Sequence, residues 1–209
     1  MKETSKETAK ALPAYHPRYE AMVQNWRVHA RKSMLLWIVL LVVGILLSAI
    51  GVGVIIVIIA LAMIVTQVST RSAFNANRAA ILRNLKAQGR LEKAMQGLDN
   101  AKELSIGESC VLLTPDYLFY EWGLILPIKE IVWIYSKKKS GRWNCVINML
   151  NGKTYYISGV KKIKDAAEFN PLIEYLQAQN RLIQVGNTAE NKQLYSQRKA
   201  LSKDLYSDK

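Results

Sequence analysis

The chain contains an unbroken run of uncharged, mostly apolar residues from residue 34 to residue 66. About 20 such residues are enough for one transmembrane helix, and this run has 33. As a single helix it would be about 50 Å long, against a hydrocarbon core of about 30 Å. Fitting it would require a tilt of roughly 50°, beyond the usual range of about 0 to 40°. The run therefore predicts an integral membrane protein and favours two membrane passes over one.

Polar or flexible residues interrupt the run at one place, between Ser48 and Gly53. They divide it into halves of roughly 16 residues, each at the short end for a membrane span. Basic residues such as Arg31, Lys32 and Arg71 flank both ends of the run, and the expected turn carries no charge. Because positive charge marks the cytoplasmic side, we predict a cell-membrane protein with a tight two-pass hairpin and both termini in the cytoplasm. One long helix and a re-entrant hairpin that does not cross remain as alternatives.

No Asp, Glu, Lys, Arg or His lies inside the run. Such residues mark ion paths and proton relays in membrane proteins, so the run is expected to be an anchor rather than a conduit. Small residues at Gly44, Gly51 and Gly53 can let two helices pack closely. They can also support a homo-oligomer formed through the hairpin, and a small oligomeric membrane pore or a transport accessory subunit is the alternative function.

Helical spacing continues on both sides of the apolar run. Residues 13–32 predict an amphipathic helix that leads directly into the first pass. After the run, apolar residues fall near one helical stripe, which Gly89 interrupts at a position suited to a helix C-terminus. We predict two short helices, over residues 72–88 and 90–101, that connect the membrane to a soluble domain. A continuous helix with a tolerated glycine is the alternative.

From Ser109 onward the pattern becomes strand-like, with many aromatic and β-branched residues. Strands are predicted over residues 110–114, 117–122, 131–136, 143–150 and 153–157, with a further short strand over 124–126. The pair Asn151-Gly152 predicts a type I′ hairpin between the last two strands. Asn170 and Pro171 suit the N-cap and first position of a helix, and Asp165 can cap a shorter turn before it.

The predicted fold class is α+β. A transmembrane two-helix hairpin and a short helical connector precede a small antiparallel β-rich domain, which a C-terminal helix closes. The expected segments are an N-terminal cytoplasmic segment with a juxtamembrane helix (1–33), the transmembrane hairpin (34–66), the connector (67–108), the β domain with its helix (109–183) and a polar tail (184–209). The tail is rich in charge and predicts disorder or a marginal helix.

The run LLTPDYLFYEWGLILPIKEIVWIYSKKK, followed by the Asn-Gly hairpin and the closing helix, resembles the bacterial membrane-anchored pleckstrin-homology-like (PH-like) domains, including the YcxB-type family. Leu113-Thr114 before a turn, and the segment from Ile128 to Trp133, carry this resemblance, which covers about residues 109–180. It implies a PH-like fold attached to one or two membrane helices, and a scaffold rather than a reaction. A pleckstrin-homology sandwich has seven strands, and six are predicted here.

The net charge of +13 favours an anionic partner. Because the chain carries a membrane segment, the cytoplasmic leaflet is the expected partner and nucleic acid is not. Two basic clusters in the β domain are candidate contacts for lipid or a protein partner: Lys137, Lys138, Lys139 and Arg142 at a hairpin tip, and Lys161, Lys162 and Lys164 after the Asn-Gly hairpin. Each cation near an anionic leaflet contributes about 1 kcal/mol. Solvated loops are the alternative interpretation.

The sequence carries no recognisable catalytic motif. Cys110 and Cys145 lie in strand-like runs and are expected to be free thiols, while His16 and His29 lie in the N-terminal helix without other metal ligands nearby. We therefore predict no catalytic residue, no metal and no cofactor. The predicted function is a non-enzymatic, membrane-anchored interaction or scaffold module that binds a protein partner or anionic lipid head groups.

Overall fold

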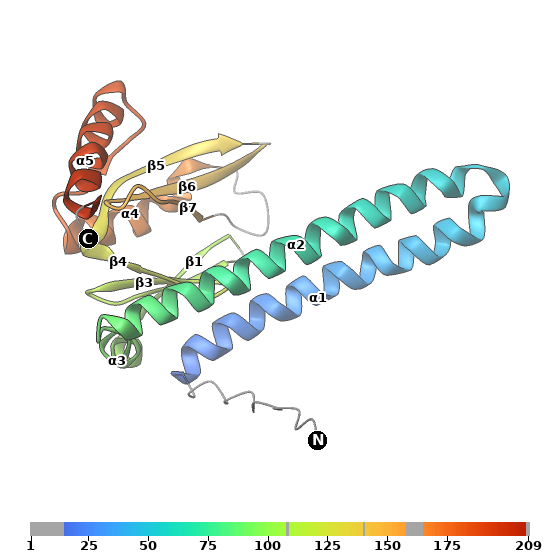
Figure 1. Cartoon of the computed structure of the whole chain (residues 1–209), viewed down its shortest axis with the longest axis horizontal. Coiled ribbons are helices and arrows are strands. Elements are labelled where there is room, and N and C mark those ends of the chain that lie inside the picture. The colour runs from blue at the N-terminus through green and yellow to red at the C-terminus, as the bar shows by residue number, and fades with distance from the viewer. Residues whose placement is uncertain (1–14, 108, 140, 158–164, 208–209) are drawn as a thin grey trace, which may run out of the picture.

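The computed structural model describes residues 15–107, 109–139, 141–157 and 165–207. Two long helices, α1 (Pro17–Leu46) and α2 (Val52–Ala87), form an antiparallel hairpin, and a short helix α3 (Leu91–Gln96) leads from it into two small β-sheets (Figure 1). Helix α4 (Asn170–Gln179) and helix α5 (Ala189–Ser207) follow the seventh strand. The predicted α+β class is confirmed.

The two long helices reverse direction at a 3-10 turn, Leu47–Ile50, followed by Gly51 with φ +80°. Both are long and apolar enough to cross a membrane, and their apolar stretches are almost entirely exposed. The alternative of one long helix is therefore wrong, because the chain turns where Ser48 and the glycines interrupt the run. A Cβ on Gly53 would overlap the Gly44 carbonyl oxygen. The glycines thus allow the close approach that the sequence predicts.

Both helices continue without a break beyond the apolar run. Helix α1 runs directly into the apolar half, as predicted for the juxtamembrane helix, but it begins at Pro17, and residues 15 and 16 of the predicted range 13–32 are not helical. The predicted separate helix over residues 72–88 is instead the end of α2. The helical path stops at Gly89, whose φ is +65°, so the alternative of a continuous helix through this glycine is wrong.

In the described ranges, eight strands form two four-stranded sheets. The first sheet contains β1 (Lys102–Ile106), β2 (Ser109–Leu113), β3 (Tyr117–Tyr120) and β4 (Leu124–Pro127), each antiparallel to the next. The second has the order β7 (Thr154–Ile157), β6 (Arg142–Met149), β5 (Ile131–Lys139) and β8 (Gln184–Val185), with β8 parallel to β5. Every predicted strand is present. However, β1 lies in the predicted connector and β8 in the predicted tail, so the sheets include residues on both sides of the predicted range 109–183.

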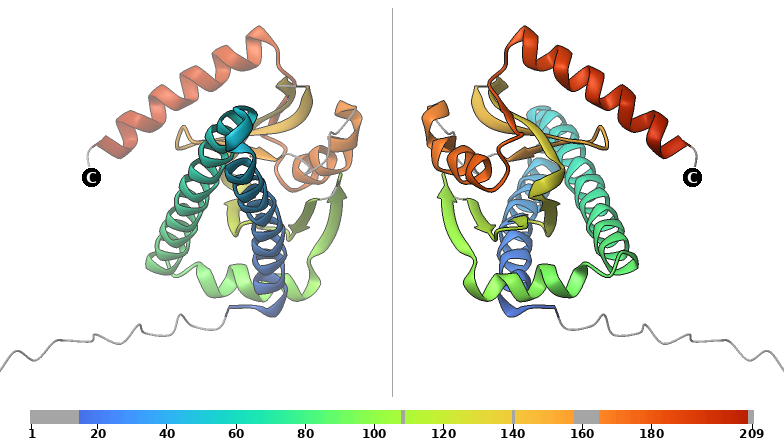
Figure 2. Two further views of the ribbon diagram at one scale, coloured as in Figure 1. Left: turned by 90° about the vertical axis from the view of Figure 1, so that its right-hand side faces the viewer. Right: turned by 90° about the vertical axis from the view of Figure 1, so that its left-hand side faces the viewer.

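The first sheet is the middle layer of the molecule, because side chains on both of its faces are buried. Leu112, Phe119 and Ile125 face the polar halves of α1 and α2. Their neighbours Val111 and Leu118 face the second sheet and α4. Figure 2 shows the first sheet beside the two long helices, with α3 crossing between them. The ends of the apolar hairpin are therefore part of the core of the β domain.

Helix α5 occupies the region predicted to be a disordered or marginally helical tail. Its Tyr195 packs against Trp133 of β5, with ring centroids 5.5 Å apart. The Trp133 indole N–H donates to the Gly186 carbonyl oxygen at 2.8 Å, and the Asn191 side chain donates to the same oxygen at 3.0 Å. These contacts hold the C-terminal region on the second sheet.

Two local predictions need correction. Asn151-Gly152 joins β6 to β7 as expected, but only Gly152 has a positive φ, of +77°, whereas a type I′ turn requires two such residues. The Gly152 N–H donates to the Met149 carbonyl oxygen at 3.0 Å, which is the pattern of a type I turn closed by a left-handed glycine. Asn170 is the first residue of α4 rather than its cap. The predicted Asp165 cap is confirmed, since its Oδ1 accepts from the Ala167 N–H at 3.0 Å.

Candidate functional site

The four cations of the first predicted cluster lie in sequence at the turn end of the β5–β6 hairpin. Lys139 pairs with Arg142 across the hairpin, and Lys137 and Lys138 precede them on β5 with exposed side chains. In Figure 1 this end of the hairpin points in the same direction as the apolar half of α1 and α2. We call residues 137–142 the basic hairpin. The second predicted cluster, Lys161, Lys162 and Lys164, lies outside the described residues.

Trp143 supports the basic hairpin from the inside. It pairs with Lys138 across the two strands, is half-buried, and packs against the core between the sheets. The indole therefore belongs to the core rather than to the exposed cationic surface. This packing ties the base of the hairpin to the rest of the β domain.

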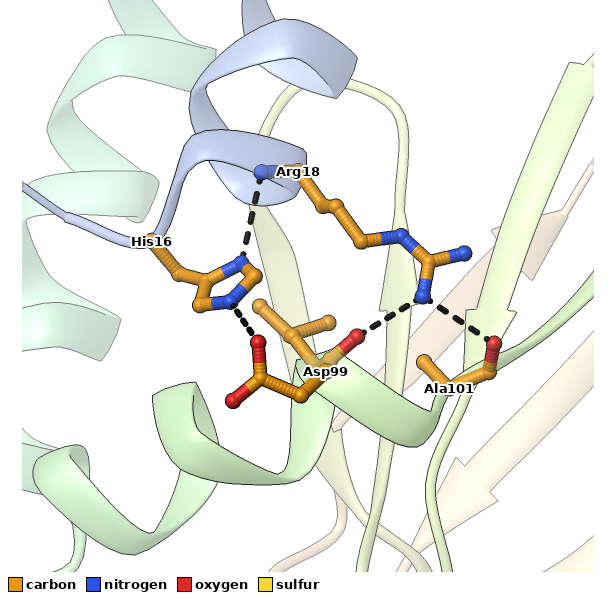
Figure 3. A network of polar contacts seen from close by, with 5 residues as sticks. His16, Arg18, Asp99 and Ala101 are labelled. Carbon is orange, nitrogen blue, oxygen red and sulfur yellow. Dashed lines mark hydrogen bonds and ion pairs between the residues drawn. The ribbon is translucent and has the colours of Figure 1, made fainter.

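The start of α1 is fixed to the turn that precedes β1 (Figure 3). Arg18 Nη1 donates to the carbonyl oxygens of Leu98, at 2.8 Å, and Ala101, at 3.2 Å. His16 Nε2 lies 2.9 Å from Asp99 Oδ1, and its Nδ1 accepts from the Arg18 backbone N–H at 3.3 Å. Arg18 thus satisfies carbonyl groups at the end of the 3-10 turn that follows α3.

A buried arginine joins both long helices to the β3–β4 turn. Tyr19 of α1 donates its hydroxyl to the Gly123 carbonyl oxygen at 3.0 Å, and Arg78 Nε of α2 donates to the Tyr19 oxygen at 3.3 Å. The Arg78 guanidinium lies 5.3 Å from the Tyr19 ring centre and forms an ion pair of 3.4 Å with Glu20. With 9% exposure, Arg78 is a structural link. In the sequence Arg78 is one of several basic residues that follow the apolar run; its spacing from Leu82, on one helical face, is the signal that it lies within the apolar stripe.

Three aromatic rings form another link close to the apolar run. Phe74 of α2 stacks on Trp122 of the β3–β4 turn, with ring centroids 4.8 Å apart and an angle of 8° between the planes. Trp26 of α1 meets Phe74 edge to face at 5.5 Å. Together with the Arg78 and Arg18 contacts, this stack sets the angle between the β domain and the hairpin.

Glu121 is the only non-glycine residue with a positive φ, of 28°, in the part of the chain that the structure describes. Burial raises the pKa of its carboxyl, and the Ser109 hydroxyl donates to it. It lines a cavity of about 290 Å³ together with Trp26, His29 and Cys110. Burial, followed by the nearby Glu103, raises the pKa of the Cys110 thiol to about 12, so at neutral pH this cysteine is not a thiolate nucleophile.

Burial also raises the pKa of Cys145 to about 12. This thiol is fully enclosed in the core between the two sheets. Both cysteines are free, as predicted from the sequence. Comparison of the chain with protein-family models, with curated proteins and with solved structures found no match.

Proposed function

We propose that the chain is a non-enzymatic, membrane-anchored module whose PH-like β domain holds its basic hairpin against anionic lipid head groups. The observation that carries this proposal is the continuity of α1 and α2. Each helix runs without interruption from the apolar segment into the core of the β domain. The position of the domain relative to the bilayer is therefore set by two rigid helices rather than by a flexible linker.

In the proposed topology the hairpin crosses the membrane twice and both termini lie in the cytoplasm. Supporting this, Arg71 lies between the helices just beyond the apolar run, where its guanidinium donates to the Ala30 carbonyl oxygen and to Met34 Sδ. Arg31 and Lys32 lie on α1 at the same end of the hairpin. Cations at this level are favoured on the cytoplasmic side.

The assignment to a PH-like fold is supported by the number and order of the first seven strands, to which the two-residue β8 is an addition. Strands β1 to β7 are antiparallel neighbours within two sheets, and α4 follows them. Strand β1 supplies the seventh strand that the sequence pattern lacked. A small sandwich of this kind, with basic residues on one hairpin, is suited to a scaffold that binds a negatively charged membrane surface.

The basic hairpin has a suitable charge and direction for lipid contact. Four cations near an anionic leaflet contribute at most about 4 kcal/mol, at about 1 kcal/mol each. This attraction falls off within a Debye length of about 8 Å at physiological ionic strength, so the orientation of the hairpin decides whether it acts. Because the helices already hold the domain at the membrane, contact between the hairpin and the leaflet is an intramolecular step. It therefore does not require the domain to be brought to the membrane from solution.

The test compares the full chain in lipid nanodiscs of phosphatidylcholine alone with discs that also contain phosphatidylserine. Backbone amide exchange of residues 137–142 should slow in the anionic discs, and added salt should reverse the effect. Replacing Lys137, Lys138, Lys139 and Arg142 by Gln should abolish the difference. A control with the same charge change, Gln at the exposed Lys129, Lys153, Arg181 and Lys192, should retain it. Equal exchange in the two lipids would refute the proposal.

A further inference from the structure

A second basic surface lies between the two long helices. A cavity of about 640 Å³ lies between the polar halves of α1 and α2, lined by Arg27 of α1, by Arg83 and Lys86 of α2, and by the apolar Leu82 and Leu91. A smaller cavity of about 80 Å³ shares Arg27 with it and extends toward the apolar run. We call the two cavities together the basic groove. In Figure 2 the helices diverge from the hairpin turn like the arms of a V, and α3 crosses the open end.

The groove is strongly cationic and poorly neutralised. Its lining includes six cations: Arg27, Arg31, Arg71, Arg78, Arg83 and Lys86. Glu20 pairs with Arg78. Within the described ranges, no carboxylate lies within ion-pair distance of the side chains of Arg27, Arg83 or Lys86. Cations around an apolar floor are complementary to an amphipathic anion.

The length of the groove and its distance from the membrane limit which molecules can occupy it. Arg71 follows the apolar run by five residues, and Lys86 is 15 residues further along the same helix, a distance of about 22 Å at 1.5 Å per residue. The lipid head-group layer is only about 5 to 8 Å thick on each side of the membrane. A lipid head group can therefore reach the lower end of the groove but not Arg83 or Lys86. A helix of about 15 residues leaving the membrane would span it.

A second copy of this chain does not supply such a segment. Before the apolar run the chain carries seven Lys and Arg against three Asp and Glu, and after it 22 against 13. Self-association through the groove would therefore place like charges together. We infer that the basic groove binds an acidic, amphipathic juxtamembrane helix of a different membrane protein. This inference concerns another surface than the basic hairpin and does not rest on lipid contact there.

The probe is a synthetic peptide of 15 residues with Leu and Glu at helical spacing, labelled with a fluorophore. Its binding to the full chain in phosphatidylcholine nanodiscs is measured by anisotropy. Gln at Arg27, Arg83 and Lys86 should weaken binding by about tenfold, since three exposed ion pairs that each contribute about twofold are lost. Gln at the exposed Lys129, Lys153 and Lys192, with the same charge change, should leave binding unchanged. Arg78 stays intact in both variants because it belongs to the core.

Four results would overturn the inference. The first is no binding of the acidic peptide to the wild-type chain, and the second is equal weakening by both variants, which would indicate general charge attraction. The third is equally tight binding of a matched peptide with Lys in place of Glu, which would indicate apolar contact alone. Full displacement of the peptide by phosphatidylserine in the discs would identify lipid as the occupant. None of these outcomes depends on amide exchange in the basic hairpin, so this test and that of the proposed function can fail separately.

Discussion

Gly123→Ala tests whether the Tyr19 and Arg78 contacts hold the β domain on the helices. Gly123 has φ +98°, and a Cβ there would lie 2.6 Å from the Tyr19 hydroxyl and 2.8 Å from Arg78 Cδ. Gly89 is the matched control, because it has φ +65° and its Cβ would meet nothing within 4 Å. Alanine at Gly89 measures backbone strain alone, whereas alanine at Gly123 adds displacement of the two side chains.

The expected magnitudes differ clearly. A left-handed conformation costs an L-residue about 1 to 2 kcal/mol, and this is the whole expected cost of Gly89→Ala. Moving the Tyr19 hydroxyl also breaks its hydrogen bond to the Gly123 carbonyl oxygen, at about 1 kcal/mol, and disturbs the Arg78–Tyr19 stack, at about 0.5 to 1 kcal/mol. We expect Gly123→Ala to destabilise the protein by about 2 kcal/mol more than Gly89→Ala. Its thermal midpoint should then be lower by roughly 4 to 8 °C.

Tyr19→Phe tests whether the Tyr19 hydroxyl is the group that a Cβ at Gly123 displaces. The phenylalanine keeps the ring but removes the hydroxyl that lies closest to the new Cβ. In this background Gly123→Ala should cost about 1 kcal/mol less than in the wild type, a coupling typical of residues in contact. Unfolding of the full chain in detergent can be followed by the fluorescence of Trp26 and Trp122, which lie at the same packing surface. Equal costs at Gly123 and Gly89, or strictly additive costs with Tyr19→Phe, would refute the reasoning.

Three further changes have defined outcomes. Because burial raises the pKa of Glu121 above its ordinary value of 4.5, the folded chain retains this proton and loses stability as pH rises from 4.5 through the folded pKa. Glu121→Gln should therefore raise the thermal midpoint relative to wild type more at pH 7 than at pH 4, and equal differences would contradict this. Gly53→Ala should separate the two helices near their turn, measured by the distance between spin labels on α1 and α2, whereas Gly51→Ala should not, since its Cβ meets nothing within 4 Å. Trp133→Phe removes the hydrogen bond to Gly186, and amide exchange in α5 should become faster by about fivefold, equivalent to about 1 kcal/mol.

The elements that the sequence predicted well are those with a strong local pattern. The turn of the helical hairpin and six of the strands follow from uncharged length, from glycine and from alternation of apolar residues. Strand β1 was missed because Lys102 and Glu103 are exposed on it, so that it looks like the polar end of a helical connector. Strand β8 has only two residues, Gln184 and Val185, and depends on pairing with β5. Both strands form because of contacts between residues that are distant in sequence, rather than because of local strand preference.

The two basic surfaces likewise differ in how well the sequence predicts them. The basic hairpin could be predicted because Lys137 to Arg142 are neighbours in sequence as well as in space. The basic groove could not, since Arg27 and Arg83 are 56 positions apart and come together only after the hairpin closes. From the sequence alone, Arg27 and Arg83 are interpreted only as flanking charges that set the orientation of the membrane segment. The role of Arg78 was hidden for the same reason, because Gly123 and Tyr19 approach it from other elements.

The position of the first sheet between two layers has a consequence for the order of synthesis. Its strands become available only after α1 and α2 have left the ribosome, because the hairpin precedes them in the chain. The helix ends that carry Tyr19, Met22 and Leu82 can then serve as a surface on which the sheet assembles. A fragment that begins at β1 would lack this surface and expose Leu112, Phe119 and Ile125 to water. In this arrangement the two long helices provide the surface against which the β domain packs as it folds.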